Sequence, residues 1–356
     1  MRAYCYFVEP ASYTVDLIEN IYKKIGIPYA YILDKTFAIS SNFHQLNQET
    51  FLSKKSILNK IRHLYIVWKN NDLIIINGYN NYVFLFTFFF NFFSLNRRYI
   101  AIDSDTQLNI PVNIFKRIIK SIYLRFIFRS KSIFGFSGGS KYHKDLFRYY
   151  GMNEDRIFLM PMMVNNNKFY QNKINNSLSF NFLYVGRLVK SKNVEFLLRT
   201  FKKFFSNKDA VLRIVGSGYL DNYLRKEYAS DRIIFVGKKI GKELICEYQN
   251  ASVLVCPSIF EPWGLVVNEA LSSGTPVIAS KHVGASYDLI YNKETGIIFN
   301  DKDKGPDLGD AMLLLFNNKK LRTEYSINAT LLMRNYWNYD LYKTSLLKAI
   351  NDICKK

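Results

Sequence analysis

The sequence is poor in acidic residues and in several features that define other classes of protein. Its 356 residues hold 29 acidic and 49 basic side chains, which gives a formal net charge of +20. The four cysteines are scattered, without a C-x-x-C pair or a metal-ligand spacing. Scattered cysteines are typical of buried thiols in a reducing compartment. Glu9 and Asp16 interrupt the first apolar stretch, which therefore does not resemble a signal peptide.

Long apolar runs are also missing. The most apolar segment, "YVFLFTFFFNFFSL" at 82–95, has fourteen residues and is interrupted by Thr87 and Asn91. A helix needs about twenty apolar residues to cross a bilayer. The segment therefore predicts a buried or interfacial helix that does not span a membrane.

Acidic residues are absent between Thr106 and Lys144, where eight basic side chains lie. Such a field attracts phosphates, whether in nucleic acid, anionic lipid or nucleotide. Within this region one helical face carries Ile114, Phe115, Ile118, Ile119 and Ile122, and the opposite face carries Lys116, Arg117 and Lys120. One interpretation is a core-packed helix with a solvated basic back, and the other is a helix that docks on anionic lipid.

What the sequence does have is an alternation of short apolar runs with longer amphipathic stretches, which is typical of βα units and parallel sheets. The apolar runs predict strands at 3–8, 29–33, 73–76, 99–102 and 133–136, and again at 180–186, 210–216, 232–237, 251–258 and 275–280. The predicted fold class is α/β, with two Rossmann-like doubly wound domains facing each other across a cleft.

The chain is long for one hydrophobic core and suits two domains. We predict an N-terminal acceptor-binding domain at 1–165, a polar asparagine-rich linker at 166–179 and a C-terminal nucleotide-sugar-binding domain at 180–335. A last helix, 336–356, is expected to pack back on the first domain. Ligands are expected at the carboxyl ends of the strands.

Basic residues follow the first strand of the second domain. Arg187 comes directly after Gly186, and Lys192 lies five residues further along. After the strand at 251–258, a helix is predicted to begin near Gly264, and the amides of Gly264, Leu265 and Val266 would then be free first-turn donors. Helix N-termini bind anions, so these groups together predict a diphosphate site.

Two carboxylates flank that anion site, Glu261 before the helix and Glu269 within it. A carboxylate accepts two hydroxyl protons at once, which suits a sugar diol. One glutamate would hold the ribose of a nucleotide and the other the sugar on the far phosphate. Gly216 and Gly218 form a tight turn that could approach the nucleotide, although a plain turn explains them equally well.

These motifs resemble those of the family 4 glycosyltransferases, which have the GT-B fold and are retaining and metal-independent. Their E-x7-E motif is Glu261 to Glu269 here, and their G-R-L…K element is "GRL" at 186–188 with Lys192. The resemblance implies that Arg187 and Lys192 hold the donor diphosphate, Glu269 the ribose and Glu261 the donor sugar. It implies a UDP- or GDP-linked donor sugar, no cofactor and no metal.

Asp103 and Asp105 form a D-x-D pair, which is a metal signature in the other glycosyltransferase fold. Here the pair follows a strand of the first domain, away from the nucleotide-binding motifs. We interpret Asp103 or Asp105 as a contact to the donor sugar or the acceptor, in place of a histidine common in the family.

The resemblance implies transfer of a hexose-type sugar to a glycan, in lipid-linked or cell-surface polysaccharide synthesis. The alternatives are a GT-B-fold nucleotide-sugar epimerase and, with less support, a basic nucleic-acid-binding protein, for which no reader motif is present. A dehydrogenase is disfavoured because no G-x-G-x-x-G follows the first strand. The basic region and the phenylalanine-rich segment predict a cytoplasmic enzyme resting on the anionic inner face of a membrane.

Overall fold

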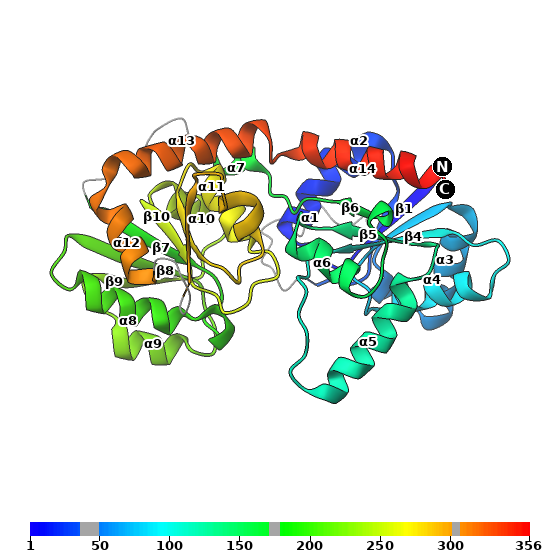
Figure 1. Ribbon diagram of the computed structural model, residues 1–356, viewed down its shortest axis with the longest axis horizontal. Helices are drawn as coiled ribbons and strands as arrows, with labels where there is room; N and C mark the ends of the chain where they lie inside the picture. Colours follow the sequence, from blue (N-terminus) through cyan, green and yellow to red (C-terminus); the bar gives the residue numbers. More distant parts are fainter. Residues whose placement is uncertain (36–49, 171–178, 301–306) are drawn as a thin grey trace. The chain divides into compact units, whose positions relative to one another are not determined.

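The computed structural model describes residues 1–35, 50–170, 179–300 and 307–356. The chain forms two compact units. The first consists of Met1–Met163 together with Tyr339–Lys356, and the second is Val164–Asn338. Each unit contains one parallel six-stranded sheet with helices on both faces (Figure 1). The predicted α/β class with two doubly wound domains is confirmed for each unit.

The sheet of the first unit has the strand order β2-β1-β3-β4-β5-β6. Its strands are β1 (Ala3–Phe7), β2 (Tyr29–Tyr31), β3 (Leu73–Asn77), β4 (Tyr99–Ser104), β5 (Ile133–Ser137) and β6 (Ile157–Leu159). Its main helices are α1 (Ser12–Leu17), α2 (Lys23–Ile25), α3 (Ile57–Asn70), α4 (Tyr82–Phe93), α5 (Ile114–Phe128), α6 (Tyr142–Tyr149) and α14 (Tyr339–Cys354), with a π-helical turn η1 (Ile18–Tyr22) between α1 and α2.

One side of the first sheet packs against α3, α4, the C-terminal part of α5, and α6. Leu64, Phe84, Leu124 and Leu146 bring these helices into a single core with the sheet residues. On the other side, α14 contacts β6 and η1. The hydroxyls of Tyr22 and Tyr342 form a buried hydrogen bond of 2.9 Å there, which ties α14 into the first unit.

The sheet of the second unit has the order β12-β11-β10-β7-β8-β9. Its strands are β7 (Phe180–Val185), β8 (Ala210–Val215), β9 (Ile233–Gly237), β10 (Val253–Cys256), β11 (Val277–Ser280) and β12 (Gly296–Phe299). Its helices are α7 (Asn166–Phe169), α8 (Val194–Phe205), α9 (Asp221–Tyr228), α10 (Gly241–Gln249), α11 (Leu265–Ser272), α12 (Leu308–Asn317) and α13 (Lys319–Asn335).

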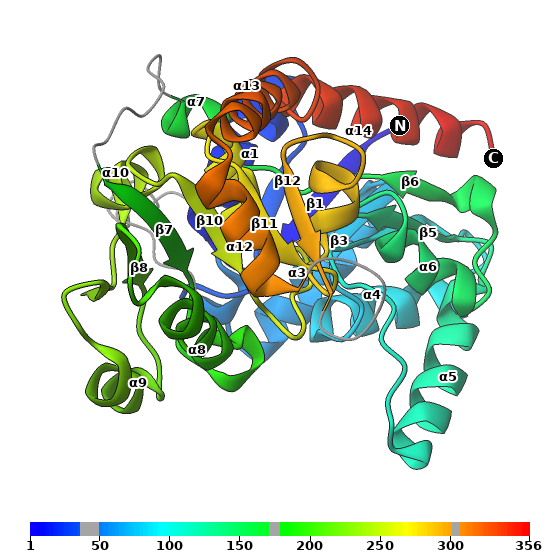
Figure 2. The same cartoon turned by 60° about the vertical axis from the view of Figure 1, so that its left-hand side comes forward.

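In the second unit, α8 and α12 share one core with one face of the sheet, through residues such as Leu197 and Met312. The helices α7, α10 and α13 pack around α11 on the other face (Figures 1 and 2). This arrangement leaves the carboxyl ends of β7 and β10 adjacent in the middle of the sheet. Those two strand ends carry most of the residues singled out from the sequence.

All ten predicted strands are present, within a few residues of the predicted bounds. Two further strands, β6 and β12, were not predicted. Residues 166–169 of the predicted linker form α7, where the Asn166 side chain donates to the carbonyls of Met333 and Trp337 at 2.6 and 2.9 Å. The predicted linker residues 171–178 lie outside the described residues.

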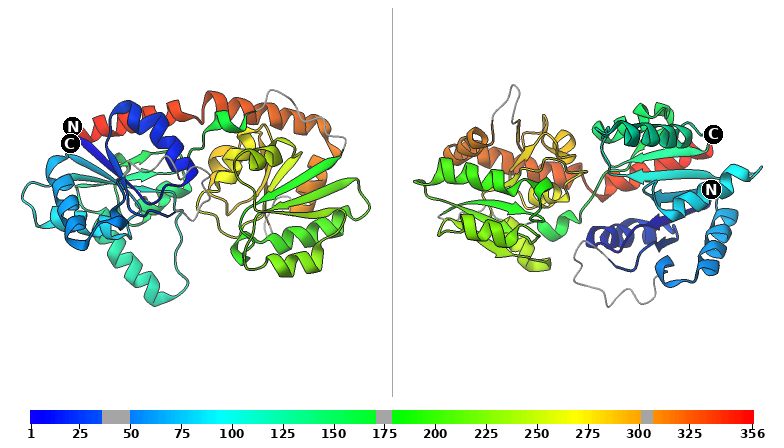
Figure 3. Two further views of the ribbon diagram at one scale, coloured as in Figure 1. Left: turned by 180° about the vertical axis from the view of Figure 1, so that it is seen from behind. Right: turned by 90° about the horizontal axis from the view of Figure 1, so that it is seen from below.

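The phenylalanine-rich segment forms α4, a helix of twelve residues. In the described parts of the chain, no helix combines the length and the apolar character needed to cross a membrane. The first turns of α5 project from the body of the first unit (Figure 1; Figure 3, left). Only Leu124, Ile127 and Phe128 of this helix are buried. One interpretation of the sequence was that the apolar face of this helix packs on the core. In the structure that face is instead exposed over most of its length.

Candidate functional site

The loops after β7 and β10 meet at the point where the strand order of the second sheet reverses. β7 continues to β8 on one side, whereas β10 lies on its other side. Open α/β sheets bind ligands at such a switch point. The two loops are joined by a hydrogen bond of 2.9 Å from the Ile259 amide to the Ser191 carbonyl. The predicted basic pair and the first predicted glutamate lie on these loops.

Lys192 and Glu261 form an ion pair across the two loops. Each side chain is only 15% exposed. Ser258 also donates to the Glu261 carboxylate, with an oxygen–oxygen distance of 3.5 Å. Since an isolated buried charge is costly, each of these groups compensates the charge of the other in a partly desolvated site. The structure thus brings together the lysine predicted for phosphate and the glutamate predicted for sugar.

The backbone of Glu261 is fixed by the segment that follows β11. Its amide donates to the His282 carbonyl at 3.1 Å, and its carbonyl accepts from the Gly284 amide at 3.0 Å. Trp263 is buried beside this turn and donates through Nε1 to Asn268 at 2.7 Å. The carboxylate of Glu261 therefore projects from a rigid backbone, and Trp263 is an anchor that the sequence analysis missed.

Gly264 lies at the N-cap of α11 with φ of +96°, a left-handed conformation that favours glycine. A Cβ atom there would lie 3.1 Å from Cγ of Glu261 and 3.0 Å from Val283. The helix begins at Leu265, so the amides of Gly264, Leu265 and Val266 lie at its N-terminal end, as predicted. This end of the helix is next to the Lys192–Glu261 pair.

Glu269 lies one turn into α11 and receives a hydrogen bond from the hydroxyl of Tyr248 on α10. Burial raises the pKa of Glu269 to about 7, and the hydrogen bond from Tyr248 opposes that shift. Tyr248 is fully buried, and its carbonyl accepts from Thr275 at 2.8 Å. Tyr248, which was not predicted as a site residue, holds one oxygen of a carboxylate predicted to bind ribose.

The glycines of the strand-end turns are explained by close backbone packing. A Cβ atom on Gly216, whose φ is +142°, would lie 1.8 Å from the Gly186 carbonyl oxygen. On Gly218 it would lie 2.4 Å from the Leu188 carbonyl oxygen. These contacts account for both glycines without a ligand, and they place the two turns side by side.

Arg187 is exposed at the end of β7. Its carbonyl accepts a hydrogen bond of 2.9 Å from the buried Tyr184 hydroxyl, which fixes this turn. No ion-pair partner for the Arg187 guanidinium is present among the residues that the structure describes. Arg187 is thus an exposed cation on a turn that Tyr184 fixes.

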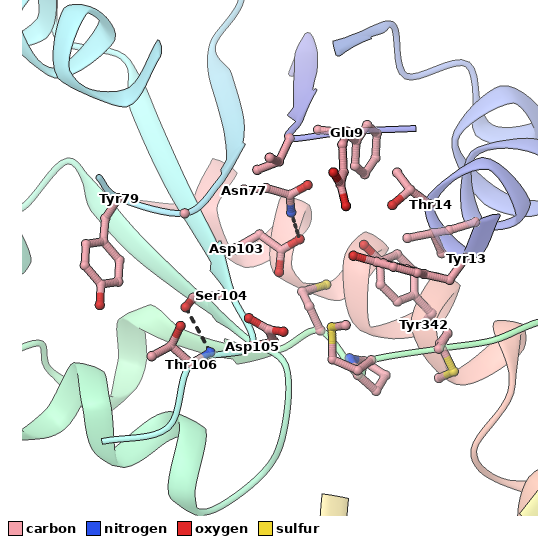
Figure 4. A pocket seen from close by; sticks show the side chains of 18 of the residues that line it. Glu9, Tyr13, Thr14, Asn77, Tyr79, Asp103, Ser104, Asp105, Thr106 and Tyr342 are labelled. Atoms are coloured by element: carbon pink, nitrogen blue, oxygen red, sulfur yellow. Dashed lines mark hydrogen bonds between the residues drawn. The ribbon is translucent and has the colours of Figure 1, made fainter. Parts of the chain in front are cut away.

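A cavity of about 240 Å³ opens at the carboxyl ends of the strands of the first unit (Figure 4). Asp103 and Asp105 line it from the end of β4, and Glu9 lines it from the loop after β1. Asn77 at the end of β3 donates to Asp103 at 2.5 Å. The lining also contains apolar and aromatic side chains, including Tyr13 and Met162. Glu9, Tyr13 and Asn77 were not predicted as site residues.

Burial and the nearby Asp105 carboxylate raise the pKa of Asp103 to about 7, and the hydrogen bond from Asn77 opposes the shift. Asp103 can therefore both donate and accept a hydrogen bond near neutral pH. Such a carboxyl beside an apolar wall suits the hydroxyls and the ring of a sugar. Within the described ranges, no group of three or more histidine, cysteine or acidic side chains is arranged to hold a metal ion.

Comparisons with known proteins give the family. Residues 166–331 match the family model "Glycosyl transferases group 1". An uncharacterised glycosyltransferase of Methanocaldococcus jannaschii is 37% identical over 119 residues. That alignment covers 32% of this chain and 30% of the relative, so the chain spans less than a third of that protein's length.

Two solved structures resemble the whole chain. The Anabaena protein HepE, crystallised in complex with UDP, has a TM-score of 0.76 with 14% identity, over 99% of this chain and all of that one. WaaG, a glycosyltransferase involved in lipopolysaccharide biosynthesis, has a TM-score of 0.64 with 14% identity, over 98% of each chain. These similarities establish the GT-B fold. Residues 166–331, which make up most of the second unit, match the group 1 glycosyltransferases, known as family 4.

Proposed function

We propose that the protein is a retaining glycosyltransferase that moves a hexose-type sugar from a nucleotide-diphosphate sugar to a glycan acceptor. The observation that carries the proposal is the contact between Lys192 and Glu261 beside the N-terminal end of α11. A cation beside a carboxylate at the switch point of the sheet supports a site that binds phosphate next to sugar hydroxyls. The family match and the binding of UDP by HepE support a nucleotide-sugar donor.

In this proposal the donor diphosphate binds to Arg187, Lys192 and the first amides of α11. These groups stabilise the negative charge that grows on the diphosphate as it leaves, which is the task of a metal ion in other transferases. Because phosphate oxygens compete for Lys192, the bound donor frees the carboxylate of Glu261 to accept hydroxyls of the donor sugar. Glu269 accepts the hydroxyls of the ribose.

In the transfer step, the bond from the anomeric carbon to the phosphate oxygen breaks, and a bond from the same carbon to the acceptor oxygen forms on the same face of the sugar. The acceptor proton passes to the departing phosphate oxygen, so the nucleotide diphosphate is released. Front-face attack of this kind retains the anomeric configuration and requires no protein nucleophile. The proposal therefore gives Glu261 a binding role and not a nucleophilic one.

The cavity of the first unit is the proposed site of the acceptor sugar. Asp103, Asp105 and Asn77 offer hydrogen-bonding groups to hydroxyls, and Tyr13 offers an aromatic surface to the sugar ring. A lipid-linked or cell-surface glycan is the acceptor that we propose, at the inner face of the cell membrane. The role printed for the structurally similar WaaG, in lipopolysaccharide biosynthesis, supports this class of acceptor.

The test is a matrix of donors and acceptors. Thermal shift with UDP, GDP and ADP identifies the base, and turnover of the matching sugar nucleotides is then measured with and without glycan acceptors. The transferase proposal requires that sugar is released only slowly without acceptor and appears on the glycan with its anomeric configuration retained. Conversion of the donor to an isomeric nucleotide sugar without acceptor would establish the epimerase alternative.

A further inference from the structure

Helix α4 differs from an ordinary surface helix, because its polar residues are buried and many of its large apolar residues are exposed. Its two polar residues, Thr87 and Asn91, are buried. The Asn91 side chain accepts from the Arg98 amide at 2.6 Å and donates to Ser132 at 3.0 Å. The outward-facing residues are instead large and apolar, with Phe89 57% exposed and Phe93 70% exposed. Exposed phenylalanine side chains on a helix indicate a surface that contacts a protein partner or a membrane and not water alone.

Helix α5 continues this exposed apolar surface. Phe126 on α5 contacts Phe88 and Phe92 on α4, with ring centroids 5.8 and 5.7 Å apart. We call the combined surface the α4–α5 face. Its exposed apolar residues are Leu85, Phe86, Phe89, Phe92, Phe93 and Leu95 from α4 and its end, and Ile114, Phe115, Ile118, Ile119, Ile122 and Phe126 from α5.

The charge in the part of the chain that forms the α4–α5 face is predominantly positive. Between Thr50 and Lys144 the sequence has fifteen basic residues and three acidic ones. Two of the acidic residues, Asp103 and Asp105, line the cavity, and the third, Asp72, lies 3.6 Å from the Arg98 guanidinium. The helices α3, α4 and α5 contain no acidic residue. A second copy of such a surface would be repelled, whereas an anionic surface would be attracted.

The face is connected along the chain to the cavity of the first unit. Asp105 and Thr106 line the cavity, and the segment that follows leads directly to the exposed Val112 and the start of α5. The side chains of Arg117 and Lys120 hold this segment, since they donate to the carbonyls of Pro111 and Asn109 at 3.0 and 2.7 Å. A partner bound at the α4–α5 face would thus be coupled to one wall of the cavity.

We propose that the α4–α5 face inserts into the interfacial layer of an anionic lipid bilayer, with its phenylalanine and isoleucine side chains among the acyl chains and its basic side chains at the headgroups. The attachment is therefore apolar as well as electrostatic. Helices with an apolar face and basic flanks bind bilayers in this way. The proposal does not depend on the reaction catalysed, because it concerns only this surface of the first unit.

The experiment measures co-flotation of the full chain with lipid vesicles. Neutral phosphatidylcholine vesicles are compared with vesicles that contain about one third phosphatidylglycerol. The apolar variant is Phe115→Ser/Ile119→Ser/Ile122→Ser, and the charge variant is Lys116→Gln/Arg125→Gln. The matched control is Ile327→Ser/Leu331→Ser on α13, whose side chains are about half exposed in the second unit.

The wild type and the control should bind the anionic vesicles and keep part of that binding at about 1 M salt, where exposed charges are screened beyond roughly 3 Å. The apolar variant should lose at least tenfold in binding, while its melting temperature and its binding of UDP stay at the wild-type values. The charge variant should bind more weakly only at low salt.

Three results would overturn the proposal. The first is equal binding by the apolar variant and the wild type. The second is complete release of the wild type by salt, which would make the attachment purely electrostatic. The third is a wild type that does not bind vesicles, with sedimentation showing a dimer that the apolar variant fails to form, because the face would then be covered by a second copy.

Discussion

Tyr248 donates its hydroxyl proton to the carboxylate of Glu269 and thereby joins helix α10 to helix α11 beneath the proposed ribose site. The tyrosine is fully buried and Glu269 is half-buried, so one carboxylate oxygen is held inside the protein. A carboxylate fixed in this way needs little reorganisation when it accepts ribose hydroxyls. Tyr248 is thus a positioning residue for the proposed nucleotide site.

Tyr248→Phe should weaken UDP binding about tenfold, the scale of one lost hydrogen bond to a charged group. The carboxylate of Glu269 would lose a donor that lowers its pKa, so more of it would be protonated near neutral pH. Calorimetric titration with UDP measures the effect. Tyr223→Phe is the matched control, because Tyr223 donates to Glu195 on the surface of the same unit. Equal losses in both variants would show that the effect is not specific to the site.

Binding of the donor should depend on pH through Glu269, whose pKa is raised to about 7. Ribose hydroxyls need an acceptor, and only the ionised carboxylate is an acceptor at both oxygens. Affinity for UDP-glucose should therefore fall as the pH is lowered through about 7, and the midpoint should move upward in Tyr248→Phe. UDP-glucose is chosen because its diphosphate does not titrate in this range. Glu269→Gln should bind more weakly than wild type and show no such midpoint. A midpoint that persists in Glu269→Gln would assign the titration to another group.

Lys192 should supply the charge stabilisation that a metal ion supplies elsewhere. Lys192→Ala is expected to lower turnover by a factor of about ten to a thousand, which is the range for one lost charge-stabilising contact. Turnover of the wild type should be unchanged by EDTA. Loss of activity on chelation, with recovery on addition of Mn²⁺, would instead make Asp103 and Asp105 candidate metal ligands.

The Lys192–Glu261 pair also makes a prediction for stability. Removal of one member leaves the other as an uncompensated, partly buried charge, which costs about 3 kcal/mol in typical buried pairs and less where water has access. Lys192→Ala should lower the melting temperature, and the double variant Lys192→Ala/Glu261→Gln should recover part of the loss. Turnover should stay lowered in both variants, because Lys192 is missing from each. This pattern separates a folding defect from the loss of a catalytic group, because the double variant regains stability but not turnover.

A substitution in the cavity of the first unit should weaken binding of the acceptor and leave binding of the nucleotide unchanged. Asp103→Asn is expected to raise the KM for the acceptor and to leave UDP binding unchanged, as measured by initial rates and calorimetry. The pKa of Asp103 is raised to about 7, so the folded state favours the protonated form. Its contribution to the free energy of unfolding is present at low pH and is lost as the pH rises from about 4 to about 7. Asp103→Asn should remove that part of the pH dependence in urea titrations.

Much of the fold could be predicted because buried parallel strands are continuous apolar runs. Segments such as "FNFLYVG" carry that pattern without help from tertiary context. The two strands that were missed are the three-residue β6 and the mostly half-buried β12, each at one edge of its sheet. Neither element has a local signal that distinguishes it from a loop. Each becomes a strand by adding to the edge of a sheet that other residues have already specified.

The candidate site was predictable where its residues are neighbours in sequence. Gly264 was placed at the start of a helix because glycine follows a turn there, and its φ of +96° confirms that conformation. Tyr248 and Glu269 are 21 residues apart on different helices, and nothing in either local pattern links them. The orientation of α5 was also out of reach, because periodicity shows that a helix has an apolar face but not what that face contacts.

The placement of α14 has a consequence for the order of folding. This helix belongs to the first unit, yet it follows the entire second unit along the chain. During synthesis all strands of the first sheet are made long before Tyr342 can reach Tyr22. One side of that sheet therefore stays uncovered until α14 has been made. The second unit is continuous in sequence and has no such delay. Expression of residues 164–338 alone is therefore the natural way to obtain one folded unit of this protein, whereas the first unit would need α14 attached through a new connection.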